Sequence, residues 1–272
     1  MRDKKEKLWQ WMTEHTRSDV AVAFSGGVDS GLLLRIACEA AKEKGTRVYA
    51  FTIQTALHPV EEADIAKHMA EEMGAIHRSI FIDVFREAGI ENNPVNRCYL
   101  CKKCMFTKLI AEASKLGIGC VIDGSNADDS KVYRPGMQAL LELKVHSPLL
   151  SLGVTKAEVR QMAAEYGMAV SEKPSTPCLA TRFPYDTPLA EEEMKKVDRL
   201  EGRLREMGFC NVRCRVHGSL LRIEVDEGAL CKLLSSRKDL LEEAKKMGYT
   251  YVTMDLEGFL SGSQDKAINK RE

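Results

Sequence analysis

A short glycine loop near the amino terminus is the first group of residues that could do chemistry. The hexapeptide SGGVDS (residues 25–30) follows a Val- and Ala-rich run over residues 19–24 and precedes a helical pattern over residues 30–42. Inward-turned backbone amides and the helix dipole together form a cradle for phosphate oxygens. The spacing and lysine of a Walker A loop are absent. A packing turn is the alternative, but the context of strand, loop and helix favours phosphate binding.

Cysteines form the second group. The chain has nine of them, and an odd count behind a charged amino terminus without an apolar core argues against a disulfide framework. Thiol chemistry or metal binding is the better interpretation. Five cysteines lie in apolar helix or strand patterns and are expected to be small buried residues: Cys38, Cys120, Cys210, Cys214 and Cys231. The other four are Cys98, Cys101, Cys104 and Cys178.

Three of those four cysteines share the segment NRCYLCKKC (residues 96–104), which we place where a loop over residues 85–97 meets a helix over residues 101–115. Its two overlapping C-x-x-C spacings suit a metal ion, an iron–sulfur cluster, or a thiolate held by nearby basic residues. A structural zinc knuckle is the alternative. A closed zinc site needs four ligands, so Cys178 would have to join the other three.

Cys178 itself lies in the proline-stiffened segment PSTPCLATRFP (residues 174–184), four residues before Arg182. This setting is typical of a positioned, partly exposed thiol rather than of core filler. Cys178 is therefore a candidate sulfur carrier or cluster ligand.

A predicted hairpin near residues 211–226 turns at Gly218 and Ser219. Strand alternation places Arg213, Arg215 and His217 on one face and apolar residues, including Cys214, on the other. The polar face fits a solvated ladder of ion pairs and a phosphate-binding surface equally well.

The surrounding pattern alternates strands and helices. Strands are expected at residues 19–24, 47–55, 76–84, 119–124 and 145–150, and helices at residues 30–42, 59–73, 101–115 and from a capping box at Thr155 to Gly167. This order predicts a parallel, doubly wound α/β sheet with ligands beyond the strand carboxyl ends. After residue 188 the order becomes helix, strand, strand, helix, strand. We expect one domain over residues 1–183 and a smaller α/β substrate-binding or oligomerisation domain over residues 184–272.

Composition excludes several classes of protein. The 272 residues are 44% hydrophobic and 29% charged, which is ordinary globular usage. Forty Lys and Arg balance forty Asp and Glu, so no net field attracts nucleic acid. No apolar stretch approaches the roughly 18 residues of a spanning helix. We expect a cytoplasmic protein with no nucleic-acid or membrane partner.

The SGGVDS loop resembles that of the N-type ATP pyrophosphatases, the PP-loop superfamily. Together with NRCYLCK, DGSNADD, YRPG, PSTPCLATRFPY, VRCRVHG and RIEV, it makes most of the chain resemble the LarE family. The resemblance implies an adenine nucleotide alpha hydrolase-like fold. It also implies an ATP-dependent sulfur transferase that converts carboxylates of a pyridinium biscarboxylate mononucleotide to thiocarboxylates in nickel-pincer nucleotide synthesis.

The resemblance also implies roles for individual residues. The residues expected to hold ATP are Ser25, Gly26, Gly27, Asp29, Ser30 and Thr52. Asp29 and either Asp128 or Asp129 would orient Mg²⁺ or the ribose. The candidate anion contacts are Arg97, Arg134, Arg213 and Arg215. The partners are ATP and a small nucleotide substrate, and a homo-oligomer is expected.

Two sulfur routes follow from the resemblance. In one, Cys178 attacks the adenylated carboxylate and gives up its own sulfur, leaving dehydroalanine. In the other, Cys98, Cys101 and Cys178 hold a four-iron four-sulfur cluster whose fourth iron carries an exchangeable sulfide. A sacrificial thiol needs no companions, so three cysteines favour the cluster. Cys104 could replace a ligand, complete a closed site or pack.

Other functions are also open. A tRNA thiolase would use the same chemistry but needs an RNA-binding module or a basic surface. An amidating ligase resembling NAD synthetase gives no reason for the cysteine set. A non-catalytic metal or redox protein leaves the SGGVDS loop unexplained.

Overall fold

The computed structural model describes residues 2–57, 61–131, 135–168 and 178–260. They form two compact units, one of residues 1–90 with 96–176 and one of residues 91–95 with 177–272. In the second unit, the buried Asn93 donates through Nδ2 to the carbonyls of Phe183 (3.0 Å) and Pro184 (2.6 Å). Domain boundaries at residues 183 and 184 stay a prediction. Within the described ranges, none of the helices combines the length and apolar character needed to span a membrane.

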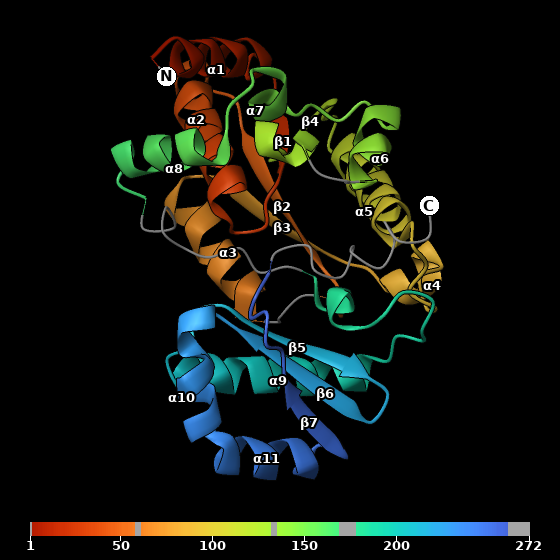
Figure 1. The fold of residues 1–272 in the computed structure, drawn as a ribbon. Coiled ribbons are helices and arrows are strands. Elements are labelled where there is room, and N and C mark those ends of the chain that lie inside the picture. The colour runs from red at the N-terminus through yellow and green to blue at the C-terminus, as the bar shows by residue number, and fades with distance from the viewer. Residues whose placement is uncertain (1, 58–60, 132–134, 169–177, 261–272) are drawn as a thin grey trace. The chain divides into compact units, whose positions relative to one another are not determined.

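The first unit is built on a four-stranded parallel sheet, in the order β3-β2-β1-β4. Its strands are β1 (Val20–Ala23), β2 (Val48–Gln54), β3 (Ile76–Phe81) and β4 (Cys120–Ile122). Val20 pairs with both Val48 and Cys120, so the carboxyl ends of β2, β1 and β4 lie along the same end of the sheet. The predicted parallel α/β fold is confirmed (Figure 1).

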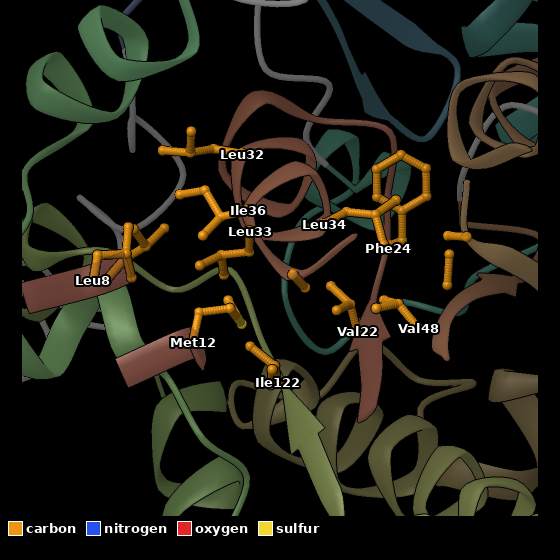
Figure 2. Packing of buried hydrophobic residues seen from close by; sticks show 14 of the residues in the cluster. Leu8, Met12, Val22, Phe24, Leu32, Leu33, Leu34, Ile36, Val48 and Ile122 are labelled. Atoms are coloured by element: carbon orange, nitrogen blue, oxygen red, sulfur yellow. The ribbon is translucent and has the colours of Figure 1, made fainter. Parts of the chain in front are cut away.

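Helices precede, connect and follow the strands of this sheet. They are α1 (Arg2–His15), α2 (Val28–Lys44), α3 (Glu61–Glu72), α4 (Val84–Ala88), α5 (Arg97–Lys115), α6 (Gly136–Glu142), α7 (Pro148–Ser151) and α8 (Lys156–Glu165). Two hydrophobic clusters cover opposite faces, because neighbouring residues of β1 alternate between them. Val20 and Val22 pack with α1, α2 and α8, whereas Ala21 packs with α5 and α6. Figure 2 shows Val22 in the first of these clusters with Met12 of α1 and Leu34 of α2.

Three local predictions for this unit were wrong. A loop was expected from residue 85, but residues 84–88 form the short helix α4. Asp83 caps its start, and Gly89, in the left-handed backbone conformation, ends it. The helix α5 begins at Arg97 rather than at residue 101, so the cysteines lie on the helix itself. The fifth strand over residues 145–150 is reduced to a single bridge between Ile122 and His146, because Pro148 starts α7.

The second unit contains a three-stranded sheet in the order β5-β6-β7. Its elements are the 3₁₀ turn η3 (Leu179–Arg182), α9 (Glu191–Glu206), β5 (Val212–His217), β6 (Leu220–Val225), α10 (Leu230–Ser235), α11 (Arg237–Lys246) and β7 (Tyr251–Met254). The pair β5/β6 is the predicted antiparallel hairpin, and β7 adds parallel to β6. The predicted order of helix, strand, strand, helix and strand differs from the structure at one point, because two helices, α10 and α11, separate β6 from β7 where one was expected.

The cysteines expected in the core divide into three kinds. Cys214 is buried, and Cys38 and Cys120 are partly buried. Burial raises the pKa of the Cys38 thiol to about 12 and that of the Cys120 thiol to about 11. The prediction was wrong for Cys210 and Cys231, which are exposed.

Candidate active site

The SGGVDS loop joins the carboxyl end of β1 to the amino terminus of α2. Gly26 has φ +73°, a conformation that strains residues with a Cβ. Ser30 Oγ accepts from the Ser25 N–H at 3.3 Å and donates to the Gly27 carbonyl at 3.3 Å, which closes the loop on itself. Gly27 caps α2 without a side-chain hydrogen bond. The first-turn amides of α2 therefore have no side-chain cap, as a phosphate cradle requires.

The loop after β4 approaches this cradle closely. A Cβ built on Gly124 would lie 3.0 Å from the backbone nitrogen of Ser30 and 3.4 Å from the Cβ of Asp29. Because the nearest atom belongs to the backbone rather than to a flexible side chain, a Cβ at this position would force the start of α2 to shift by a few tenths of an ångström. The loops that follow β1 and β4 are thus in close contact.

A Gly124→Ala substitution should push the first turn of α2 out of place. We expect weaker ATP binding and a loss of about 1–3 kcal/mol in the free energy of unfolding, as for other overpacked sites. Gly119→Ala is the matched control, because a Cβ there meets nothing within 4 Å. Calorimetric ATP titration and urea unfolding of both variants check this. Equal ATP affinity in the two variants would contradict the close approach.

Acidic residues gather around the loop. Asp29 Oδ1 accepts from Asn126 Nδ2 at 3.2 Å, and its Oδ2 forms an ion pair with Lys156 Nζ. Asp128 Oδ2 accepts from the Lys156 backbone N–H at 2.8 Å, while Asp129 Oδ2 accepts from the Asn126 N–H at 3.0 Å. The structure therefore links Asp29 and Asp128 through one lysine. Sequence reasoning missed Lys156.

Asp123, at the end of β4, is a buried carboxylate that the sequence analysis also missed. It accepts from the Ser125 N–H and hydroxyl at 3.0 Å each and from the Ser147 hydroxyl at 2.6 Å. Lys102 Nζ on α5 lies 3.4 Å from it. Asp123 thus ties the cysteine-bearing helix to the same strand edge as the glycine loop.

Thr52 is buried behind the glycine loop on β2. Its hydroxyl donates to the Phe24 carbonyl at 2.9 Å and lies 2.9 Å from His77 Nε2. Since that hydroxyl has one proton, Nε2–H of His77 is the donor of the second bond. Burial, together with the charge of Lys67, lowers the pKa of His77. Thr52 supports the loop from behind, and its contact with the nucleotide stays a prediction.

The cysteines of α5 follow one another at intervals of one turn. Cys98 is exposed, Cys101 is 8% exposed and Cys104 is partly buried. Residues three apart on a helix are neighbours, so Cys98 and Cys101 share one face. Burial and the nearby Glu87 carboxylate raise the pKa of the Cys104 thiol, which favours packing over thiolate chemistry. Arg97, expected to contact an anion, is 3% exposed.

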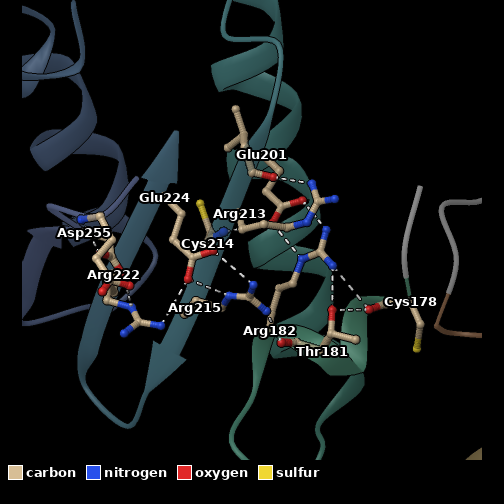
Figure 3. Close-up of polar contacts among 12 residues, drawn as sticks. Cys178, Thr181, Arg182, Glu201, Arg213, Cys214, Arg215, Arg222, Glu224 and Asp255 are labelled. Carbon is tan, nitrogen blue, oxygen red and sulfur yellow. Dashed lines mark hydrogen bonds and ion pairs between the residues drawn. The ribbon is translucent and has the colours of Figure 1, made fainter. Parts of the chain in front are cut away.

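In the second unit, hydrogen bonds to its backbone hold Cys178 in place (Figure 3). The Cys178 carbonyl accepts from the Thr181 N–H (3.1 Å), the Thr181 hydroxyl (2.8 Å) and Arg182 Nη1 (3.3 Å). Arg182 in turn forms a bidentate pair with Glu201, with both N···O distances 2.8 Å and side-chain exposures of 1% and 0%. Glu201 also accepts from the Cys214 backbone N–H at 2.9 Å.

The polar face of the hairpin is buried only in part: Arg215 is buried, Arg213 is partly buried and His217 is exposed, so a fully solvated ladder does not describe it. Arg215 forms a bidentate pair with the fully buried Glu224, with both distances 3.0 Å, and donates to the Thr181 carbonyl at 2.5 Å. Arg213 differs. Its guanidinium stacks over Phe259 and, within the described ranges, forms no ion pair. Burial and the neighbouring Arg182 lower its pKa to about 10. Arg213 is thus the better-placed cation for an incoming anion.

Several predicted site residues are placed only in part. Arg134 and the prolines before Cys178 lie outside the described residues. Cys98 and Cys101 belong to the first unit and Cys178 to the second. Among the residues that the structure describes, no group of three or more His, Cys, Asp or Glu is arranged to hold a metal ion. The ligand set of the predicted cluster stays a prediction.

Comparison with known proteins places this site in context. Residues 5–90 match the family model for asparagine synthase. The pyridinium-3,5-bisthiocarboxylic acid mononucleotide synthase of Lactiplantibacillus plantarum is 34% identical over 93% of this chain and 91% of its own length. An uncharacterized protein of Synechocystis is 35% identical over 99% of this chain and all of its own length. The tRNA-specific 2-thiouridylase MnmA of Moorella thermoacetica is 27% identical over 69% of this chain and 64% of its own length.

The parallel sheet, the glycine loop after β1 and these matches define the class: an ATP-dependent sulfur transferase built on a PP-loop domain. Within that class, the similarity to the Lactiplantibacillus synthase runs through both compact units rather than through the nucleotide loop alone. The chain belongs to the LarE family.

Proposed function

We propose that this enzyme adenylates a carboxylate of a pyridinium biscarboxylate mononucleotide and converts it to a thiocarboxylate in nickel-pincer nucleotide synthesis. The observation that carries the proposal is the anchored Cys178, whose carbonyl is held by Thr181 and a buried Arg182. A thiol fixed by its own backbone fits a nucleophile better than core filler does. The similarity to the Lactiplantibacillus synthase supports the substrate class.

The first step takes place at the glycine loop. A carboxylate oxygen of the substrate attacks the α-phosphorus of ATP, the bond to the β-phosphate breaks, and pyrophosphate leaves. The first-turn amides of α2 would bind the phosphates, and Ser30 keeps the loop closed. Asp29 and Asp128 supply the carboxylate oxygens that Mg²⁺ prefers, so they fit as its protein contacts. Bound Mg²⁺ would neutralise phosphate charge.

The second step would use the anchored loop of the second unit. In the sacrificial route, the thiolate of Cys178 attacks the acyl carbon of the adenylate, and AMP leaves with the electron pair of the acyl–oxygen bond. Loss of the Cα proton of residue 178 to a base then breaks its Cβ–S bond, so the product leaves as a thiocarboxylate and dehydroalanine remains. In the cluster route, Cys178 would instead be a ligand of the cluster. Arg213, which forms no ion pair in the described ranges, would bind the substrate phosphate. Arg215 is already paired with Glu224 and supports the carbonyl of Thr181, so we propose a scaffolding role for it.

The route of the sulfur atom rests on the cysteines of α5. Cys98 and Cys101 lie one turn apart on one helix, a spacing that fits two thiolate ligands, and Cys178 would be the third. A four-iron four-sulfur cluster held there would supply an exchangeable sulfide. Iron and sulfide analysis after anaerobic reconstitution tests this. Iron bound by the wild type and lost in Cys98→Ala and Cys101→Ala supports the cluster, and an iron-free wild type leaves the sacrificial route.

Asp29→Ala and Ser30→Ala should each abolish substrate-dependent pyrophosphate release. The first removes a carboxylate beside the phosphate cradle, and the second removes the hydroxyl that closes the loop. We expect losses of about 10²–10³-fold, the scale for one preorganised transition-state contact. The exposed Asp64→Ala serves as control. Unchanged pyrophosphate release in both loop variants would remove the glycine loop from the mechanism.

Transfer of sulfur to tRNA is the alternative function, because some of the similar proteins are tRNA-specific 2-thiouridylases. The MnmA relatives are 27% identical and match 57–69% of this chain, which makes them more distant than the synthase. Unmodified tRNA should therefore give no pyrophosphate release.

We also predict a homo-oligomer, which light scattering of the purified protein would test.

A further inference from the structure

We propose that Lys156 is a catalytic residue of adenylation: it neutralises Asp29 in the nucleotide-free enzyme and binds the pyrophosphate leaving group once Mg²⁺ and ATP occupy the loop. The inference depends on the proposed adenylation step but not on the identity of the acceptor. Neither the sequence motifs nor the family resemblance singled out this lysine.

The backbone of Lys156 is firmly held. Its N–H donates to Asp128 Oδ2 at 2.8 Å, and two residues earlier the Val154 carbonyl accepts from the Ala127 N–H at 2.9 Å. Thr155 and Glu158 form both bonds of a capping box at the start of α8. Glu158 also accepts from Lys4 Nζ of α1 at 2.7 Å. These contacts fix the root of the side chain beside the loop after β4.

The ammonium group, in contrast, can move. Lys156 pairs through Nζ with Asp29 Oδ2, and the two side chains are 34% and 19% exposed. A lysine ammonium is a point charge on a flexible four-carbon stem with three rotatable donors. Exchange of one oxygen partner for another nearby therefore requires rotation of the side chain and no movement of the backbone.

The charges around the loop favour movement of the Lys156 ammonium from Asp29 to the phosphates once Mg²⁺ and ATP bind. Without nucleotide, Asp29 is a negative group at the mouth of a site built for phosphate, so an unpaired Asp29 would repel the triphosphate. If Mg²⁺ binds Asp29, the carboxylate no longer needs the lysine. When the bond between the α- and β-phosphates breaks, its electron pair stays on the departing pyrophosphate. A cation held at that position stabilises the charge as it develops.

A purely structural role makes a different prediction. If Lys156 served only as the counter-ion of Asp29, its removal would leave an uncompensated carboxylate, and neutralising that carboxylate would restore the site. Under our proposal, Lys156 contributes to pyrophosphate binding whether or not residue 29 is charged. A double-mutant cycle between the two positions therefore separates the roles.

The test measures binding of Mg–pyrophosphate and of AMP by calorimetry in the full-length protein, with no acceptor present. We expect Lys156→Met to weaken pyrophosphate binding about tenfold or more, as the loss of a charge-assisted contact does. AMP affinity should stay within about twofold, because AMP has no β- or γ-phosphate. Lys156→Arg should recover most of the loss, and Lys44→Met, at the far end of α2, is the surface control.

The same comparison in an Asp29→Asn background completes the test. A further loss of pyrophosphate affinity when Lys156→Met is added to Asp29→Asn supports the proposal. If no further loss occurs, Lys156 is only the counter-ion of Asp29, and the proposal is overturned. Unchanged pyrophosphate binding in Lys156→Met also overturns it. If Lys156→Met does not fold, Lys156→Gln replaces it with the same criteria. Failure of the pyridinium substrate to trigger pyrophosphate release would contradict the proposed function while leaving these binding results valid.

Discussion

The Cys178→Ala variant is expected to lose thiocarboxylate formation while keeping substrate-dependent ATP–pyrophosphate exchange. Adenylation uses the glycine loop of the first unit, whereas Cys178 lies in the second unit, where Thr181 and Arg182 hold its carbonyl. Loss of the nucleophile should lower sulfur transfer by about 10⁴-fold or more, as in other enzymes that act through covalent intermediates. Product analysis by mass spectrometry, with exchange assayed in parallel, measures both activities.

The matched controls for this experiment are Cys210→Ala and Cys231→Ala. Both cysteines belong to the same unit and are exposed, so their removal changes the thiol count without disturbing the core. We expect wild-type sulfur transfer from each. Sulfur transfer by Cys178→Ala at the rate of these controls would rule out Cys178 as nucleophile and as sulfur carrier.

The second large effect is expected from Arg182→Met. This change leaves the buried Glu201 carboxylate without its bidentate partner. Among the described residues, the half-exposed Arg205, 3.5 Å away, is then the cation that still forms an ion pair with it. Breaking a buried ion pair by removing one partner costs about 3–5 kcal/mol of folding free energy. Sulfur transfer should fall as well, because the Cys178 carbonyl loses the Arg182 donor.

Urea unfolding measures the stability change, with Arg203→Met as the exposed control, whose ion pair with Glu206 should be worth at most about 0.5 kcal/mol. The double variant Arg182→Met/Glu201→Gln should recover part of the loss, since the amide oxygen can still accept from the Cys214 N–H. A loss for Arg182→Met no larger than that of the control would mean that the pair does not hold this region together.

Local sequence patterns were sufficient to predict most of the helices and strands of the first unit. The strand β1 was predictable because a short apolar run buried on both faces is typical of a parallel sheet covered by helices. The start of α8 was predictable because Thr155 and Glu158 have the capping-box spacing, and both of its hydrogen bonds are present. These features depend on residues close together in the chain.

The errors arose where competing local signals were weighed wrongly. Residues 85–97 contain Asn92, Asn93 and Pro94, which suggested one continuous loop, yet Asp83 and Gly89 bound a complete short helix. The apolar residues around Cys231 were assigned to the core, although Leu233 is the buried residue of α10 and the cysteine faces solvent. Amphipathic spacing predicts which residues share a face but places each one only approximately.

The site residues that were missed act across long sequence distances. Lys156 and Asp29 are 127 positions apart, and Arg182 and Glu201 lie on different elements of the second unit. No local pattern distinguishes a lysine at the start of a helix from a solvent-exposed one. Glu201 lies in a helix rich in charge, where a buried carboxylate cannot be recognised without its partner.

The central claim is that ATP-driven adenylation of a carboxylate is coupled to sulfur transfer through Cys178. The most direct test is a single anaerobic turnover of wild-type protein with ATP, Mg²⁺ and the pyridinium biscarboxylate mononucleotide, followed by mass spectrometry of substrate and protein. We predict one oxygen replaced by sulfur for each pyrophosphate released, with either a loss of one H₂S at Cys178 or an unchanged protein that turns over again when sulfide is supplied. Pyrophosphate release without sulfur in the product, or sulfur transfer without ATP, would contradict the account.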